Sequence, residues 1–403
     1  MRAKSRRPIL LLCWLGGRAP KAAAAPLKPA TPDPPPMRIG LLTAELNRAN
    51  GWATYSANLV EGLHALGIQT AVACARNSPP SPHNTHPLLP SLTPPDKHSL
   101  ARSLRLLPRL RRLFHDCDII HATAEPYAIL AAALAGKRPL FLTAHGSYVN
   151  LPRMRRFPVG ALYRRAMQRA QLICVSRHTA NVAGEWLSAA NIAVINNGVD
   201  ATRFASPAPQ VHKRTATVLT AGGIKPRKGT LQLVEAMAVV RETLPAAQCV
   251  ILGDPGAGSN YTKRLRRRIA ELNLKDHVRI AGFVDEAIMR GWMAAADVVA
   301  LPAINDGLFF EGFGLVLLEA GAAGTAVVGT DNCGVADAII HGETGLVIAQ
   351  DQVKRELPLA LAQLLSDPAR AAAMGAAGRK YARAQTWQRV AEQVSELYQA
   401  ALA

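Results

Sequence analysis

The sequence lacks any cysteine pattern that would indicate a disulfide framework or a metal site. Its six cysteines have no CxxC or metal-ligand spacing, and several fall inside apolar, strand-like runs. We therefore expect reduced core cysteines, as in a cytosolic protein. The six are Cys13, Cys74, Cys117, Cys174, Cys249 and Cys333.

The sequence also lacks an apolar run of the roughly 18 to 20 residues that a membrane-spanning helix needs. The short run Ile9–Gly17 follows a basic start and resembles a signal peptide in outline, but Arg18 and Lys21 come soon after it. Met37 stands directly before a strand-like run. We therefore expect residues 1–36 to be a start-site artefact or a disordered extension, and the protein to be cytoplasmic or peripheral to the inner face of the membrane.

Acidic residues are scarce in the front half. Residues 37–198 hold eighteen Lys/Arg and seven Asp/Glu, whereas residues 199–403 hold twenty-two and twenty. A basic half can meet an anionic membrane, a phosphorylated acceptor or nucleic acid. The basic segments lack a row of interleaved aromatic residues, so we expect no nucleic-acid partner.

Two segments, Arg102–Arg112 and Arg153–Arg169, concentrate arginine among apolar residues. One interpretation is a pair of helices with a solvated basic face. The other is peripheral contact with anionic lipid headgroups, because basic amphipathic surfaces bind membranes without spanning them.

From Met37 onward, short apolar runs alternate with longer amphipathic stretches, and 403 residues suffice for two cores. This alternation predicts an α/β fold with parallel, doubly wound sheets, whose ligands bind at the carboxyl ends of strands. Strands are expected at 38–44, 69–74, 118–122, 139–144, 172–175, 192–195, 216–221, 247–252, 277–281, 297–301, 326–328 and 345–348. Helices are expected at 52–66, 100–115, 126–135 and 178–187 in the front half, and from Leu231, Gly314 and Trp387 in the second.

The stretch Glu311–Ala320 combines two carboxylates, a glycine turn and an apolar helix start. We expect the free backbone N–H groups of that helix to belong to about Phe313, Gly314 and Leu315, where they favour an anionic or hydroxyl-rich ligand. Eight helical positions would separate Glu311 from Glu319 by roughly 12 Å. That spacing suits two hydroxyl-bearing ends of one long ligand, such as a nucleotide sugar, although two glutamates on a surface helix are commonplace.

The sequence Glu-Gly-Phe-Gly-Leu-x-x-x-Glu-Ala resembles the signature of the family 4 retaining glycosyltransferases. The resemblance implies the GT-B fold, in which two Rossmann-like domains face each other across a cleft. It covers nearly all of 37–403. The implied division is an acceptor-side domain over 37–198 joined by the C-terminal helix 385–403, a hinge over 199–210, and a nucleotide-sugar-binding domain over 211–384.

The turn Gly222–Gly229 carries three cations between a strand and a helix, which suits a pyrophosphate. The family's lysine matches Lys228, but Gly223 stands where the family has an arginine. Arg227 or Lys225 can compensate. Asn196 and Asp337 also depart from the family, which has Pro and Glu there.

On the acceptor side, Gly51 opens a helix after the first strand, and His145 ends the strand 139–144. A lone glycine turn is weak evidence, and a histidine is more often packed than catalytic, but a strand end that faces a cleft favours a role. The resemblance places His145 near the transferred sugar. His121, at another strand end, is interpreted as structural.

The resemblance implies transfer of a hexose from a UDP- or GDP-linked donor to a hydroxyl of a glycan, lipid or small-molecule acceptor, with retention. His145 and Glu311 are the candidate catalytic residues. No Asp-x-Asp pair lies in a setting that suits a metal, so no metal or other cofactor is expected. A non-catalytic nucleotide-sugar-binding or scaffold protein of the same fold is the alternative. The candidate donor-binding residues are Gly51, Arg227, Lys228, Phe313, Gly314, Leu315 and Glu319.

Overall fold

The computed structural model describes residues 37–90, 97–206, 208–213, 216–254, 256 and 259–403, all within one compact unit that begins at Pro36. The expectations for residues 1–36, including Cys13, lie outside the described residues. The other five cysteines are free and buried, as predicted.

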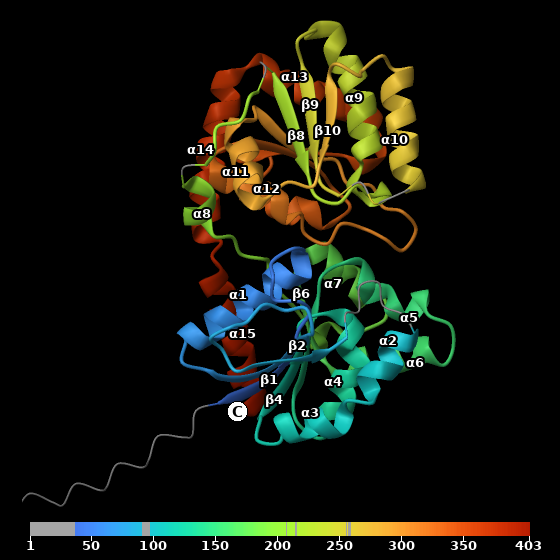
Figure 1. Ribbon diagram of the computed structural model, residues 1–403, viewed down its shortest axis with the longest axis vertical. Coiled ribbons are helices and arrows are strands. Elements are labelled where there is room, and N and C mark those ends of the chain that lie inside the picture. The colour runs from blue at the N-terminus through green and yellow to red at the C-terminus, as the bar shows by residue number, and fades with distance from the viewer. Residues whose placement is uncertain (1–36, 91–96, 207, 214–215, 255, 257–258) are drawn as a thin grey trace, which may run out of the picture. The chain divides into compact units, whose positions relative to one another are not determined.

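The first half of the unit is a seven-stranded parallel sheet in the order β3-β2-β1-β4-β5-β6-β7. Figure 1 shows β1, β2, β4 and β6 of this sheet among its helices. Strand order reverses at β1, so the loops after β1 and β4 diverge and leave a crevice at the carboxyl edge of the sheet. The strands are β1 (Arg38–Leu42), β2 (Gln69–Ala75), β3 (Thr85–Leu89), β4 (Ile119–Ala122), β5 (Leu140–Ala144), β6 (Gln171–Cys174) and β7 (Ile192–Val194).

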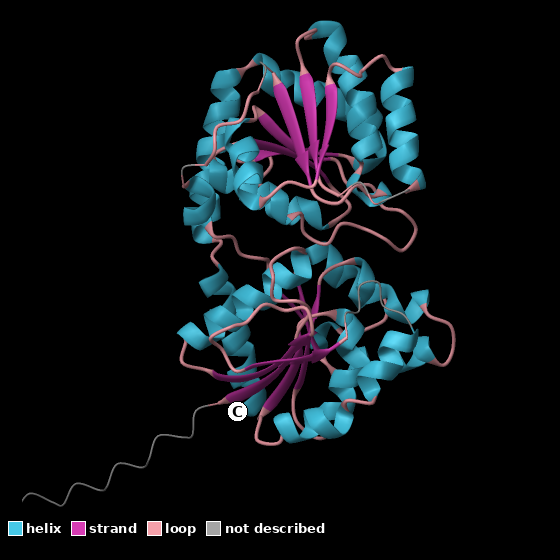
Figure 2. Cartoon of the chain, viewed as in Figure 1, coloured by secondary structure: helices cyan, strands magenta, loops and turns pink. Residues whose placement is uncertain are grey.

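Helices cover both faces of this sheet (Figure 2), because alternate side chains of its buried strands point to opposite sides. One face packs on α3, α4 and α6, and the other on α1 and the C-terminal helix α15. The helices are α1 (Gly51–Ala65), α2 (Lys97–Leu104), α3 (Leu107–Leu113), α4 (Ala128–Ala135), α5 (Leu151–Met154), α6 (Val159–Arg169), α7 (Arg177–Gly184) and α15 (Trp387–Leu402).

The second half repeats the plan with a six-stranded parallel sheet in the order β10-β9-β8-β11-β12-β13. Here the strand order reverses at β8, next to β11. The strands are β8 (Thr217–Ala221), β9 (Gln248–Leu252), β10 (Val278–Gly282), β11 (Val298–Leu301), β12 (Ala326–Thr330) and β13 (Gly345–Ile348). The helices are α8 (Ala201–Ala205), α9 (Thr230–Thr243), α10 (Asn260–Glu271), α11 (Glu286–Ala295), α12 (Leu315–Ala323), α13 (Val353–Ser366) and α14 (Pro368–Ala384).

The two doubly wound parallel sheets confirm the predicted fold class, and the domain boundaries stay a prediction. Some details differ from expectation. The edge strand β3 was missed, and the single helix expected at 100–115 is divided into α2 and α3, with Pro108 in the first turn of α3. Proline favours the first turn of a helix because its missing N–H has no partner there anyway.

His121, which was interpreted as structural, is fully buried in the first half of the molecule. Its ring contacts the Tyr398 hydroxyl at 2.5 Å and the Thr143 hydroxyl at 2.9 Å. Burial, and the neighbouring His145 to a smaller degree, lower the pKa of His121 to about 3. The bond to Tyr398 also ties α15 to the first sheet.

A polar contact between the two halves lies just before the expected hinge. Asn196 donates to the Val175 carbonyl at 3.0 Å and to Asp337 Oδ2 at 3.2 Å, and the backbone N–H of Arg177 donates to the same oxygen at 2.7 Å. The two positions that depart from the family pattern, Asn196 and Asp337, therefore contact each other.

Candidate active site

A cavity of about 710 Å³ lies where the carboxyl ends of the two sheets meet. Loops that follow β1, β4 and β5 form one wall, and loops that follow β8 and β11 form the other together with the start of α12. All nine sequence-predicted site residues line it: Gly51, His145, Arg227, Lys228, Glu311, Phe313, Gly314, Leu315 and Glu319. Their individual roles stay predictions.

Glu311 is held between two cations. Lys228 Nζ lies 2.9 Å from Glu311 Oε1, and Arg227 Nε lies 3.5 Å from Oε2. Burial would raise the pKa of Glu311, but Lys228 and then Arg227 outweigh that effect and hold it below its ordinary value. Glu311 is therefore a carboxylate at neutral pH.

The loop that carries Glu311 is anchored in the first half of the molecule. Phe310 is buried in the first core, and its backbone N–H and carbonyl both bond the Ser147 hydroxyl, at 2.8 Å and 2.7 Å. Asn150 donates to the Leu308 carbonyl at 3.1 Å. These contacts fix the position of Glu311 relative to the first sheet.

The helix α12 begins at Leu315, one residue later than expected, with Gly314 as its N-cap at φ +83°. That left-handed conformation favours glycine. The N-cap has no side-chain hydrogen bond, so the first amides of α12 remain available to a ligand. The spacing of roughly 12 Å between Glu311 and Glu319 assumed eight helical positions. That assumption was wrong, because residues 311–314 are not helical.

Glu319 lies in the second turn of α12 and is partly buried in the cavity wall. Burial, and then Glu286, raise its pKa to about 7, whereas Lys228 and Arg203 oppose the shift. Its protonation therefore changes near neutral pH.

The cationic turn after β8 supplies the rest of the donor-side wall. Gly223, at the position where an arginine was expected, lines the cavity beside Lys225, Arg227 and Lys228. The structure therefore brings together the two residues that were predicted to compensate for the missing arginine.

On the opposite wall, Gly51 opens α1, and the Asn50 side chain caps the helix by accepting from the Ala53 N–H. Apart from adjacent residues of its own helix, a Cβ added at Gly51 would meet none of the described residues within 4 Å. The space in front of Gly51 is therefore open to a ligand.

His145 Nε2 lies 2.8 Å from the Thr123 carbonyl oxygen. A carbonyl only accepts, so Nε2 carries the proton and Nδ1 is a lone-pair acceptor. Burial lowers the pKa of His145 to about 4, and this hydrogen bond offsets only part of the effect. His145 is therefore neutral at physiological pH.

Sequence reasoning missed Glu125, which follows β4 and also lines the cavity. It is 1% exposed, and its Oε1 accepts from the His145 backbone N–H at 2.6 Å. The strand-end rule that selected His145 applies equally to Glu125. A second signal also points to Glu125, because β4 lies where the strand order reverses. That signal is not visible in the sequence, since it depends on the order of the strands in the sheet.

Within the described parts of the chain, no group of three or more His, Cys, Asp or Glu side chains has an arrangement that could hold a metal ion. None of the described helices has the length and apolar character that crossing a membrane requires.

Two family models match the chain: "Glycosyltransferase Family 4" over residues 49–203 and "Glycosyl transferases group 1" over residues 203–381. A GDP-mannose-dependent alpha-(1-6)-phosphatidylinositol monomannoside mannosyltransferase of Mycobacterium tuberculosis is 34% identical over 307 residues, which cover 72% of this chain and 78% of that protein. A D-inositol 3-phosphate glycosyltransferase of Jonesia denitrificans is 31% identical over 221 residues, which cover 51% of this chain and 50% of that protein.

Among solved structures, Anabaena Alr3699/HepE in complex with UDP superposes with a TM-score of 0.70 at 19% identity, covering 90% of this chain and all of that one. At that identity the likeness supports the fold alone. The family models, the identity to the mycobacterial enzyme and the arrangement of the two sheets agree, and the chain belongs to glycosyltransferase family 4 and has the GT-B fold.

Proposed function

We propose that this glycosyltransferase transfers mannose from GDP-mannose, with retention of anomeric configuration, to a hydroxyl of an acceptor that contains an inositol phosphate. The relatives support the donor and the acceptor class, because the mycobacterial protein is named for GDP-mannose and phosphatidylinositol monomannoside, and the Jonesia protein for inositol 3-phosphate. Retention is the mode implied by the Glu311–Glu319 signature.

The observation that carries the proposal is the cluster of Lys228, Arg227 and Glu311 on one wall of a cavity shared by both sheets. Lys228 and Arg227 have further N–H donors besides those that face Glu311. In the proposed complex these donors and the first amides of α12 hold the diphosphate. They stabilise the charge that grows on it as the glycosidic bond breaks, and such stabilisation is often the largest single contribution to catalysis.

The remaining groups orient the two sugars of the donor. Glu311 accepts hydrogen bonds from hydroxyls of the hexose, and Glu319 accepts them from the ribose. His145 offers Nδ1 to a sugar hydroxyl from the opposite wall. The protein residues supply charge neutralisation and orientation in this scheme, which has no step that needs a metal.

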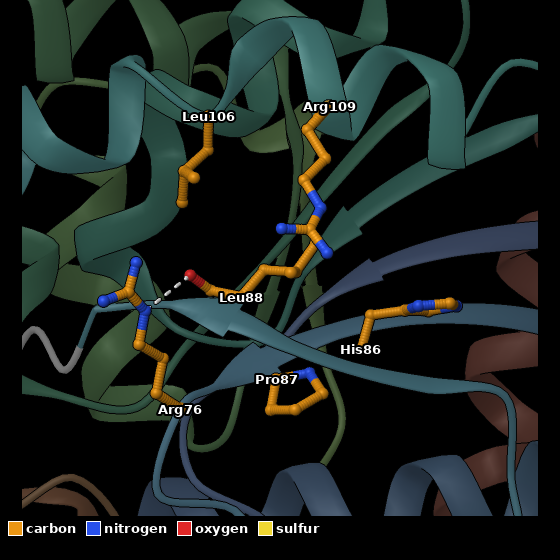
Figure 3. Close-up of a pocket in the computed structure, with 6 residues that line it drawn as sticks. All are labelled: Arg76, His86, Pro87, Leu88, Leu106 and Arg109. Atoms are coloured by element: carbon orange, nitrogen blue, oxygen red, sulfur yellow. Dashed lines mark hydrogen bonds between the residues drawn. The ribbon is translucent and has the colours of Figure 1, made fainter.

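We also propose peripheral contact with an anionic membrane through the first half of the chain. Arg105, Arg109, Arg111 and Arg112 are exposed on or beside α3, and none has an ion pair within the described residues. A cavity of about 340 Å³ lies between α3 and the edge strand β3, and Arg76 and Arg109 reach into it (Figure 3). These features support attraction to lipid phosphates.

Vesicle sedimentation tests the membrane contact. The parent protein is expected to bind anionic vesicles better than neutral ones, and less as salt rises. The double variant Arg76→Ala/Arg109→Ala loses part of that binding, whereas Arg266→Ala/Arg267→Ala, exposed on α10, keeps it. Equal binding to anionic and neutral vesicles would contradict the proposal.

Turnover tests the reaction. Full-length protein is incubated with GDP-mannose and vesicles that contain phosphatidylinositol, with inositol 1-phosphate as a soluble acceptor in a second arm. We expect GDP release that the acceptor accelerates, and an α-linked mannoside in the proton NMR spectrum of the product. A β-linked product would reject retention. Absence of GDP release from GDP-mannose in both arms would reject the proposed donor and acceptor pair.

A further inference from the structure

Glu125 is a buried carboxyl group that the proposed reaction does not use. It is the first residue of the short 3-10 helix η1 (Glu125–Tyr127), which directly follows β4 at the point where strand order reverses. The residue is 1% exposed, yet it lines the cavity. A carboxyl group in such a place is costly to bury and calls for a physical account.

The surroundings of Glu125 suit an un-ionised acid. Oε1 accepts from the His145 N–H at 2.6 Å, and Oε2 has no hydrogen-bond partner among the described residues. No cation in that part of the chain forms an ion pair with Glu125. A buried carboxylate without a cation is strongly disfavoured, so the proton resides on Oε2 while Oε1 continues to accept.

The peptide that Glu125 holds packs against the loop of Glu311. A Cβ built on Gly146 would lie 2.7 Å from Gly312 Cα, and one built on Gly312 would lie 1.7 Å from the His145 carbonyl oxygen. The backbones of the two walls therefore touch at this point. One hydrogen bond and one backbone contact connect Glu125 to the residue next to Glu311.

We propose that Glu125 is a positioning residue that, in its un-ionised form, holds the His145–Gly146 peptide against Gly312 and thereby sets His145 and Glu311 on opposite sides of the bound sugar. The inference rests on the proposed function, because it assigns Glu125 a role in placing that reaction's sugar-binding groups.

Ionisation of Glu125 is expected to disturb this arrangement. Burial raises its pKa to about 8, against the opposing effect of the backbone amides of Glu125, His145 and Gly146. Among the described residues, Cys174 on β6, with a pKa of about 12, and Tyr148 on η2 (Ser147–Asn150), with a raised pKa, interact electrostatically with Glu125. His145, whose backbone N–H bonds Glu125, has a pKa of about 4. Across the cavity, Glu319 has a pKa of about 7. Above about pH 8 Glu125 therefore gains a charge that none of these groups neutralises.

Two variants separate the role of the proton from the role of the side chain. Glu125→Gln keeps an oxygen acceptor for the His145 N–H and stays neutral at every pH. Glu125→Ala removes the acceptor. Glu45→Gln is the matched control, because Glu45 is also a buried acid, 7% exposed, near the carboxyl end of the neighbouring strand β1, but it does not line the cavity.

Steady-state turnover of GDP-mannose and calorimetric binding of GDP are then measured at pH 6.5 to 9.5. We expect Glu125→Ala to lower kcat by about 10²-fold, as misplacement of catalytic groups by about 1 Å does, with GDP affinity retained. Glu125→Gln is expected to retain parent kcat at pH 7 and to keep it above pH 8, where the parent and Glu45→Gln lose activity. A kcat of Glu125→Ala equal to that of the parent would overturn the inference. A loss of kcat above pH 8 in Glu125→Gln as large as in the parent would also overturn it.

Thermal unfolding tests the proton without relying on turnover. Because burial raises the native pKa from the ordinary 4.5 to about 8, the parent binds the extra proton only when folded between those values. Its stability therefore falls as pH rises from about 4.5 to about 8. Glu125→Gln is expected to show a smaller fall in Tm than the parent, and Glu45→Gln a fall equal to the parent's. An identical fall in Glu125→Gln would overturn the inference even if Glu125→Ala does not fold.

The failure of the proposed function looks different. If the parent neither binds GDP nor releases it from GDP-mannose, but Glu125→Gln still shows the smaller fall in Tm, the donor assignment fails and the un-ionised state of Glu125 stands.

Discussion

The two walls of the cavity are built from the same kind of sheet but carry their charge differently. On the second-sheet wall, Lys228 and Arg227 each form an ion pair with the Glu311 carboxylate. On the first-sheet wall, burial keeps His145 and Glu125 uncharged at neutral pH, with pKa values of about 4 and 8. The first half is nevertheless the more basic part of the chain. The two facts are compatible because the arginines of that half lie mostly on its outer surface.

This contrast matches a division of labour. A wall with paired charges can exchange its internal partners for a diphosphate and sugar hydroxyls, because both are strong hydrogen-bonding groups. In the proposed complex, the neutral wall directs hydroxyl groups without attracting the diphosphate to the wrong side.

Glu311→Gln removes the anion from the charged wall and leaves Lys228 and Arg227 in place. We expect turnover to fall by about 10²- to 10³-fold, the usual cost of losing one well-placed polar contact in a transition state. GDP affinity should survive, since the two cations remain. Single-turnover kinetics with GDP-mannose measures the first effect and calorimetry the second; unchanged turnover would refute the sugar contact.

Gly146→Ala pushes the two walls apart. Gly146 has φ +132°, and an added Cβ would lie 2.7 Å from Gly312 Cα. Because the clash is with backbone, the loop of Glu311 must move, and we expect turnover to fall by about 10²-fold. A loss of about 1–3 kcal/mol in unfolding free energy should accompany it.

Gly136→Ala is the control for that substitution. Gly136 also has positive φ, at +60°, but a Cβ there would meet none of the described residues within 4 Å apart from its chain neighbours. It should destabilise the fold through backbone strain alone and leave kcat near the parent value. A similar loss of kcat in both variants would mean that general destabilisation, and not the wall contact, explains Gly146→Ala.

The protonation of Glu319 gives the smallest effect. Its pKa of about 7, raised by burial, means that a carboxylate able to accept two ribose hydroxyls predominates only above neutral pH. GDP affinity should therefore rise by up to about 10-fold between pH 6 and pH 8. Part of any change in GDP affinity with pH comes from titration of the GDP phosphate. The test is therefore whether Glu319→Gln makes GDP affinity depend less on pH. If the variant shows the same pH dependence as the parent, Glu319 is not its source.

Local sequence pattern was sufficient to predict the two sheets. Buried parallel strands are continuous apolar runs, so they can be recognised without knowing which strands lie beside them. The edge strand β3 has an exposed Pro87 and a less apolar sequence, so the same rule missed it. The loop Phe309–Gly312 shows the limit for the site. The sequence placed Glu311 before a helix, but nothing local indicates that Phe310 enters the other core or that Ser147 bonds it.

Glu125 was missed for a related reason. Its importance depends on β4 lying beside β1 and on the contact between Gly146 and Gly312, and both involve residues far apart in the chain. Local pattern therefore identified motif residues on both walls, but not the contacts that position them.

To test the charged wall as the donor site, GDP, UDP and ADP are titrated calorimetrically into residues 37–403 and into the Lys228→Ala variant of the same fragment, with the full chain as reference. We expect GDP to bind most tightly. Lys228→Ala should weaken GDP binding by about 10- to 100-fold, since a charge-assisted hydrogen bond contributes about 1.5–3 kcal/mol. Equal GDP affinity in the parent and the variant would remove Lys228 from the phosphate site and contradict the charged wall as the donor site.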